Sequence, residues 1–153
     1  MMRMMAAVCV TALCACAPAQ EAKEQTPVSD TQVPAPTPDQ VTTRITAEQN
    51  GQTVNVALNE RFAIELVGVP TAGYVWAPKT LPPFVQRAGE AGGNTVPEQS
   101  QPGYTGGNHW EVIGFDAVKV GSGKLKLEQR RSWEDAKEKP ADTFTVSFEV
   151  IKK

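Results

Sequence analysis

Short runs of residues from about position 42 onward alternate between hydrophobic and polar side chains. A period of two places every second side chain on one face of an extended chain, as in a strand with one buried face. The hydrophobic positions of these runs are Val54, Val56 and Leu58; Phe62, Ile64 and Leu66; Leu125 and Leu127; and Phe144, Val146, Phe148 and Val150. The pattern predicts β-strands, and no stretch shows a convincing helical period.

Turn-forming residues separate these runs. Asn-Glu, Pro-Thr-Ala-Gly, a Gly-rich stretch and Gly-Ser-Gly fall between them, and such residues are typical of tight connections between strands. About seven short strands in roughly 110 residues predict a single all-β domain over residues 42–153, built as an antiparallel β-sandwich.

The stretch 110–120 alternates less regularly than the other runs. Trp110 and Val112 lie on one register, whereas Ile113 and Phe115 lie on the opposite one. Gly114 stands beside this change, and glycine inside a strand often marks a bulge. We therefore expect a bulge or a bend at Gly114.

Residues 16–41 differ in composition from the predicted domain. They contain five prolines among Ala, Gln, Glu, Thr and Ser, and almost no large hydrophobic side chain. Such a segment buries too little surface to offset the entropy of ordering it. It predicts a disordered, Pro-rich tether that extends at most ~3 Å per residue.

The first sixteen residues have the pattern of an export signal. Arg3 precedes a hydrophobic run over residues 4–15, which is too short for a membrane-spanning helix. The sequence Leu13-Cys14-Ala15-Cys16 is similar to a bacterial lipobox. This resemblance implies that residues 1–15 are a cleaved lipoprotein signal peptide and that Cys16 is lipidated. The chain would then be anchored to a membrane of the cell envelope, facing the periplasm or the surface. An ordinary cleaved signal that is rich in Cys is the alternative.

Composition narrows the possible functions. With 21% charged residues and a formal net charge of −2, the chain has no basic surplus, so we expect no nucleic-acid binding. All three cysteines lie at or before position 16, so the predicted domain has no disulfide, thiolate nucleophile or sulfur metal site.

His109 is the only histidine, and no G-x-S-x-G-like turn accompanies it. We therefore expect neither an enzyme nor a bound cofactor or metal ion, and we expect His109 to be a partly exposed strand residue.

Three interruptions of the strand pattern stand out. The first loop is Val69-Pro70-Thr71-Ala72-Gly73-Tyr74, with Trp76 two residues later; the second is Pro102-Gly103-Tyr104-Thr105-Gly106-Gly107-Asn108; the third is Arg130-Arg131-Ser132-Trp133-Glu134-Asp135. Each combines small or turn-forming residues with at least one aromatic side chain.

Together these loops resemble those of the chagasin family, whose members inhibit papain-like cysteine peptidases. The family pattern is N-P-T-T-G-Y-x-W in the first loop, G-x-G-G in the second and R-P-W in the third. The chain matches it at Pro70, Thr71, Gly73, Tyr74 and Trp76, at Gly106 and Gly107, and at Arg131 and Trp133. It departs from the pattern at Val69, Ala72 and Ser132, and it has one extra residue in the second loop. The resemblance extends from about residue 50 to residue 152.

The resemblance implies an immunoglobulin-like sandwich with the three loops at one end, and an occluding mechanism in which no bond is made or broken. Thr71, Ala72 and Gly73 would cover the catalytic thiol of the peptidase, with Pro70 fixing the backbone before them. Gly106 and Gly107 would pair with the edge of the cleft, and Arg131 and Trp133 would form the anchor. The implied partner is a papain-like cysteine peptidase, and we expect the inhibitor to be a monomer.

Each of these residues also has a purely structural interpretation. Pro-Thr-Ala-Gly forms a good turn on its own, and Gly106-Gly107 is a flexible pair in most proteins. Tyr74 and Trp76 lie two apart, which favours a place in the core. Trp133 sits among polar residues, which favours contact with a partner over packing onto the sandwich.

A different class of function remains open at this point. On the same fold the chain could be an envelope lipoprotein that binds another protein without inhibiting a peptidase. Convergence of the three loops at one end with an exposed Trp133 would favour inhibition. Scattered loops or a buried indole would favour the binding module.

Overall fold

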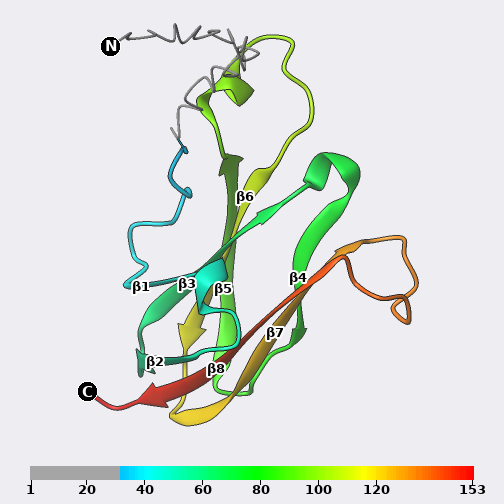
Figure 1. Ribbon diagram of the computed structural model, residues 1–153. Coiled ribbons are helices and arrows are strands. Elements are labelled where there is room, and N and C mark those ends of the chain that lie inside the picture. The colour runs from blue at the N-terminus through cyan, green and yellow to red at the C-terminus, as the bar shows by residue number, and fades with distance from the viewer. Residues whose placement is uncertain (1–31) are drawn as a thin grey trace, which may run out of the picture.

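A computed structural model describes residues 32–153, which form two packed β-sheets (Figure 1). The predicted signal peptide, Cys16 and the tether up to residue 31 lie outside the described residues. The strands of the described part are β1 (Thr43–Thr46), β2 (Thr53–Ala57), β3 (Arg61–Gly68), β4 (Tyr74–Thr80), β5 (Val85–Asn94), β6 (His109–Ala117), β7 (Gly121–Arg131) and β8 (Asp142–Ile151). One sheet, sheet A, has the order β1-β3-β6-β5, and the other, sheet B, has the order β2-β8-β7-β4.

The core between the sheets consists of the hydrophobic positions that the alternation predicted. Phe62 of β3 stacks on Phe115 of β6 at a centroid distance of 5.4 Å and contacts Phe148 of β8 at 4.8 Å. These fully buried rings join sheet A to sheet B and exclude water between them. The remaining core side chains include Ile45, Val56, Ile64, Leu66, Trp76, Leu125, Leu127, Phe144, Val146 and Val150. The predicted all-β sandwich is therefore confirmed.

Two strand pairings were not expected from the sequence. β1 runs parallel to β3, with Ile45 opposite Ile64, and β2 runs parallel to β8, with Val56 opposite Val150. The remaining pairings within the described residues are antiparallel. β1 and β2 are thus short edge strands, one in each sheet. The 3-10 turn η1 (Ala47–Gln49) lies between them and connects sheet A to sheet B.

The expected irregularity at Gly114 lies on the neighbouring strand. β6 is continuous from His109 to Ala117, and the register shift occurs in β5 between Arg87 and Gly89. Gly89, at a φ of 137°, stands opposite Gly114. The bulge therefore belongs to β5, and Gly114 lets the bulged backbone come close: a Cβ at Gly114 would lie 3.6 Å from the carbonyl oxygen of Gly89.

The strand register brings the three loops to the same end of the sandwich. In sheet A the end residue of β3, Gly68, is opposite His109, and His109 is also opposite Asn94 of β5. In sheet B Tyr74 is opposite Arg131. An isolated bridge between Val69 and Tyr74 joins the two sheets at this point. The first, second and third loops therefore emerge from one end, as Figure 1 shows at its upper and right-hand side.

Residues 32–41 differ from the expected tether. They run in extended form along sheet A, drawn in blue in Figure 1, and reach β1 at the opposite end from the three loops. Among the described residues, no helix is long and apolar enough to cross a membrane.

Candidate functional site

The first loop is a 3-10 turn held by its own backbone. η2 (Pro70–Ala72) ends at Gly73, whose φ of 83° is in the left-handed region that favours glycine. Val69 and Tyr74 exchange two backbone hydrogen bonds of 3.2 Å, and the Ala72 and Gly73 amides donate to the carbonyls of Val69 and Pro70. The backbone thus fixes the loop although Val69 has no polar side chain.

Gly73 and Trp133 bring the first and third loops into contact. A Cβ on Gly73 would lie 2.2 Å from the Cη2 atom of Trp133, so the indole occupies the space that a side chain would fill. Trp133 nevertheless remains 71% exposed. The outer edge of its six-membered ring therefore lies against the first loop, and most of its surface is exposed to solvent. A large exposed indole is a typical feature of a binding site.

Arg131 makes a second connection between the same two loops. Its Nε donates to the carbonyl oxygen of Ala72 over 3.0 Å, and its guanidinium lies 4.2 Å from the ring centroid of Tyr74. Glu134 accepts the Arg131 backbone amide at 3.2 Å and pairs with its Nη1 at 3.7 Å. Glu134 thus holds the base of the third loop.

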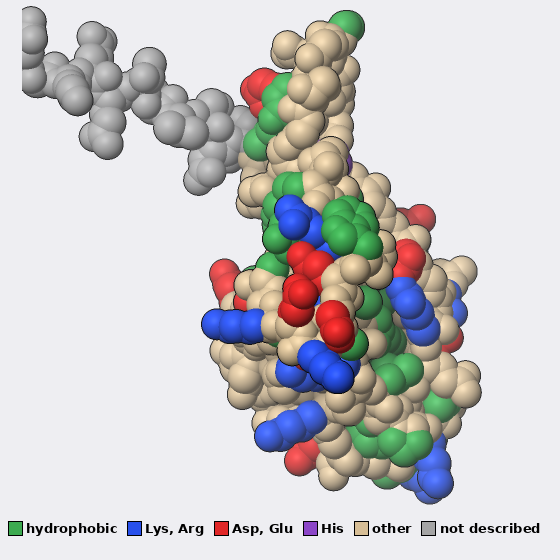
Figure 2. Space-filling view, turned by 90° about the vertical axis from the view of Figure 1, so that its right-hand side faces the viewer, with side chains coloured by type: hydrophobic (Ala, Val, Ile, Leu, Met, Phe, Trp, Pro, Cys, Tyr) green, Lys and Arg blue, Asp and Glu red, His purple; other side chains and the backbone are tan. Residues whose placement is uncertain are grey.

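The second loop follows the 3-10 turn η3 (Pro97–Ser100), and Gln99 organises the whole connection between β5 and β6. The Gln99 Oε1 accepts the backbone amides of Thr95 at 2.6 Å and Val96 at 3.1 Å, while its Nε2 donates to the carbonyl oxygen of Asn108 over 2.7 Å. The Thr95 hydroxyl donates to that same carbonyl oxygen. These bonds close the base of the loop and leave its tip projecting from the molecule (Figure 2).

The tip of the second loop is rich in glycine for a conformational reason. Gly106 and Gly107 have φ values of 80° and 91°, which other residues rarely adopt. The Tyr104 side chain packs beside Gly107, and Tyr104 is 45% exposed. His109 begins β6 as a partly exposed residue, as expected, with its Nδ1 3.2 Å from the carbonyl oxygen of Gly107.

A groove of about 740 Å³ lies between β4 of sheet B and strands β5 and β6 of sheet A, and it reaches the first loop at Pro70. Pro70 lines one end, Val75 and Ala77 of β4 line one side, and Asn94 and His109 line the other. Figure 2 shows this side of the molecule, where hydrophobic side chains lie beside acidic and basic ones below the projecting loop. Pro70 is the one residue of the three loops that lines this groove, so the groove adjoins the first loop and runs along the side of the sandwich.

Glu111 is a half-buried acid at the base of the site. It lies on the inward register of β6, and its carboxylate fills the space beside Gly68, which has no side chain. Its Oε2 accepts the Trp76 backbone amide at 2.8 Å, while its Oε1 is buried without a hydrogen-bond partner. Burial therefore raises the pKa of Glu111 above its ordinary value of 4.5. Trp76 is itself buried, and its Nε1 donates to the carbonyl oxygen of Val67.

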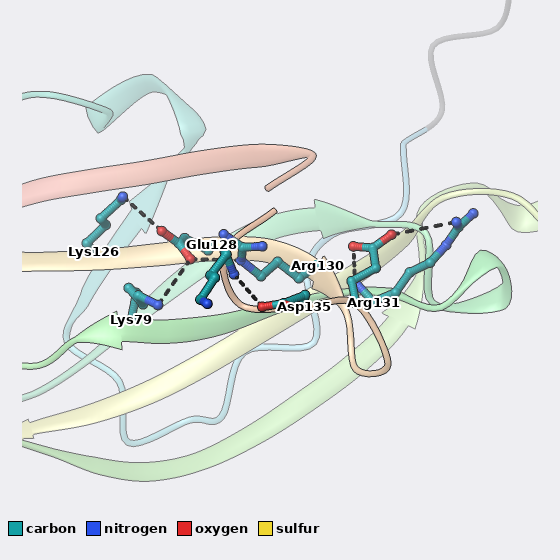
Figure 3. A network of polar contacts seen from close by, with 8 residues as sticks. Lys79, Lys126, Glu128, Arg130, Arg131 and Asp135 are labelled. Carbon is teal, nitrogen blue, oxygen red and sulfur yellow. Dashed lines mark hydrogen bonds and ion pairs between the residues drawn. The ribbon is translucent and has the colours of Figure 1, made fainter. Parts of the chain in front are cut away.

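A cluster of charges on the outer face of sheet B adjoins the third loop (Figure 3). The Glu128 carboxylate accepts hydrogen bonds from Lys126 and Arg130, each at 2.9 Å, and lies 4.0 Å from the Nζ of Lys79. These bonds lower the pKa of Glu128 to about 2, with the bond from Lys126 contributing most. The cluster fixes Arg130 at the start of the third loop.

The structure brings some of the predicted site residues together and leaves others apart. Pro70, Thr71, Ala72 and Gly73 form one surface with Arg131 and Trp133, whereas Gly106 and Gly107 lie on a separate projecting loop at the same end. Tyr74 and Trp76 support the site, and Trp76 belongs to the core as expected. Sequence reasoning missed Glu111, although an acid on the same register as Ile113 and Phe115 was a signal. Within residues 32–153, no cluster of side chains could hold a metal ion.

Comparisons with known proteins agree with this geometry. The profile of the chagasin family peptidase inhibitor I42 matches residues 55–148. Amoebiasin-1 of Entamoeba histolytica is 32% identical over 109 residues, which cover 69% of this chain and 97% of that protein. The crystal structure of the cysteine protease inhibitor EhICP2 from Entamoeba histolytica superposes with a TM-score of 0.61 at 23% identity, covering 71% of this chain and 95% of that one. The solution structure of amebosin gives a TM-score of 0.50 at 29% identity, covering 71% and 97%.

The fold and the site define an immunoglobulin-like β-sandwich that presents three loops at one end. The profile match and the identity to amoebiasin-1 add the family: the chain belongs to the chagasin family of peptidase inhibitors. The expected family and fold are thereby confirmed.

Proposed function

We propose that the protein is a reversible, occluding inhibitor of papain-like cysteine peptidases. The observation that carries this proposal is the contact between the small tip of the first loop and the exposed indole of Trp133. A narrow tip without bulky side chains fits a cleft, and an aromatic side chain beside it fits the rim. Both are already in place in the free protein, so little ordering entropy is lost on binding.

The proposed roles follow from the position of each loop. Thr71, Ala72 and Gly73 enter the peptidase cleft and cover the catalytic thiol without supplying a reactive group. Trp133 packs on the enzyme surface beside the cleft, with Arg131 holding it against the first loop. The second loop projects at the same end of the sandwich, where Gly106 and Gly107 present a backbone without side chains that can pair with the cleft edge.

The test is a titration of papain with the full chain, monitored by hydrolysis of a small fluorogenic substrate. We expect complete loss of activity at saturation and full recovery on dilution, because no covalent bond forms. Trypsin serves as the control enzyme and should keep its activity. Papain that remains fully active at micromolar concentrations of the chain would contradict the proposal and favour the non-inhibitory binding module.

We propose further that Cys16 anchors the protein to a membrane of the cell envelope. The support is the sequence Leu13-Cys14-Ala15-Cys16 at the end of the hydrophobic run. In bacterial cells fed a labelled fatty acid, the chain should carry the label, and Cys16→Ser should abolish it. Cys9→Ser is the matched control and should retain the label; a labelled Cys16→Ser variant would refute the anchor.

A further inference from the structure

The segment 32–41, here named the N-terminal strap, crosses the outer face of sheet A from the end that carries the loops to the opposite end. Near the loops, the Val33 amide donates to the carbonyl oxygen of Thr95 over 2.8 Å, and the Trp110 Nε1 donates to the carbonyl oxygen of Val33 over 2.7 Å. At the far end, the Thr42 amide donates to the carbonyl oxygen of Arg61. The strap is thus bonded to sheet A at both ends.

The middle of the strap packs closely on the sheet. Pro36 lies over Gly93 of β5, where a Cβ would come within 3.1 Å of its Cγ atom. The Thr37 hydroxyl donates to the carboxylate of Glu65, which is 6% exposed on β3. Gly93 leaves room for Pro36, and the buried Glu65 finds a hydrogen-bond donor in Thr37. Both residues therefore fit a sheet face that is covered by the strap.

The strap also explains the irregular hydrophobic register of β6. Val112 is on the outward register with Trp110, opposite Glu65, yet it is 1% exposed and does not belong to the core between the sheets. Pro38 and Val41 line a small pocket together with Val112. The strap therefore packs on the outward-facing hydrophobic residues of β6.

The point of attachment gives the strap a role in the site. Thr95, which receives the Val33 amide, is the first residue after β5, and its own amide and hydroxyl take part in the Gln99 network that closes the base of the second loop. Trp110 is the second residue of the opposite strand, β6, directly after His109. Val33 thus joins the two strands at the base of the second loop by its amide and its carbonyl.

We propose that the N-terminal strap is a positioning element of the inhibitor, which holds the base of the second loop in the geometry required for binding the peptidase. This inference rests on the proposed function for its effect on binding. The family profile begins at residue 55, so the strap lies outside the sequence that this chain shares with the profile. On this proposal, residues that precede the family domain contribute to binding of the peptidase.

Two substitutions in the full chain remove one bond each. Val33→Pro deletes the amide that donates to the carbonyl oxygen of Thr95, because proline has no backbone N–H. Trp110→Phe deletes the Nε1 donor and keeps an aromatic ring. Val33→Ala is the matched control, because it keeps both backbone groups of residue 33.

Two measurements on each variant test the role of the strap and the proposed inhibitor function separately. Amide hydrogen exchange over residues 95–108 should accelerate about tenfold in Val33→Pro and Trp110→Phe, with no change in the third loop or in Val33→Ala. The inhibition constant for papain should weaken by about the same factor. Unchanged exchange would overturn the strap as a support, and accelerated exchange with unchanged inhibition would overturn its role in binding. If the parent chain does not inhibit papain, the proposed function fails, while the exchange measurement still decides whether the strap holds the loop.

Discussion

The Nε of Arg131 donates a hydrogen bond to the carbonyl oxygen of Ala72, so the third loop holds the tip of the first. The same guanidinium lies over the ring of Tyr74 at 4.2 Å. Arginine suits this position because it can donate in its plane and stack with its face at once. The two loops therefore form one preorganised surface, and the following predictions probe its parts.

Arg131→Lys should weaken papain inhibition about tenfold while changing the melting temperature little. A lysine keeps the charge but loses both the planar Nε donor and the stacking over Tyr74, together about 1–2 kcal/mol. The control is Arg44→Lys on β1, where Arg44 pairs with Glu65 at 3.5 Å away from the loops. Inhibition assays and thermal unfolding of both variants check this; equal inhibition by Arg131→Lys and parent would contradict it.

Gly73→Ala should lose inhibition because the added Cβ displaces Trp133. The control Gly51→Ala has the same type of backbone strain, with a φ of 79°, but no atom lies within 4 Å of its added Cβ. Both variants should lose about 1 kcal/mol of stability from the left-handed backbone. Inhibition should fall only in Gly73→Ala, and a double-mutant cycle with Trp133→Ala should show that the two losses are not additive.

Trp133→Ala should reduce affinity for papain by at least about tenfold, since exposed tryptophans at interface centres are frequent hot spots. The melting temperature should stay near that of the parent because the side chain is 71% exposed. Trp76→Ala provides the contrast: Trp76 is buried in the core, so its loss should destabilise the fold by about 3–5 kcal/mol. A Trp133→Ala variant that inhibits as well as the parent would remove the proposed anchor.

Glu128 should make the fold acid-sensitive. Its pKa is about 2 in the folded protein, against an ordinary value of 4.5, so its stabilising contribution is complete above 4.5 and is lost as the pH falls towards 2. Glu128→Gln should be less stable than the parent at neutral pH, and the difference should shrink through this window. Urea unfolding of both proteins at a series of pH values measures this difference in the free energy of unfolding. A difference that does not vary with pH would contradict the prediction.

Glu111 should have the opposite pH dependence. Because its pKa is raised in the fold, the carboxyl is neutral in both states well below 4.5, and the cost of its buried charge appears as the pH rises through the folded pKa. Glu111→Gln keeps an acceptor for the Trp76 amide and removes the charge. It should unfold at a higher urea concentration than the parent at neutral pH and at about the same concentration in acid. A less stable Glu111→Gln at neutral pH would show that the carboxylate itself is required.

The strands and the loop residues could be predicted because they depend on local patterns. Alternation over Phe144–Val150 indicates one buried face, and the polar neighbours of Trp133 indicated an exposed indole. The strap could not be predicted, because its composition resembles that of a disordered segment. Its order comes from hydrogen bonds that the Val33 backbone makes with the Thr95 carbonyl and the Trp110 side chain, more than sixty positions away, which no local pattern encodes. The only sign of the strap in the sequence was that Trp110 and Val112 are hydrophobic although they lie on the register opposite to that of Ile113 and Phe115.

The parallel pairing of β2 with β8 has a consequence for how the chain folds. Thr53 is opposite Ser147 and Ala57 is opposite Ile151, so one edge of sheet B joins the beginning of the sandwich to its end. Contacts between residues so distant in sequence are slow to form, since a long loop must close before any of them contributes. During synthesis, β2 has no partner strand until β8 has left the ribosome. The sandwich therefore closes only after nearly the whole domain has been made, and the chain passes through a long period in which its hydrophobic strands are exposed.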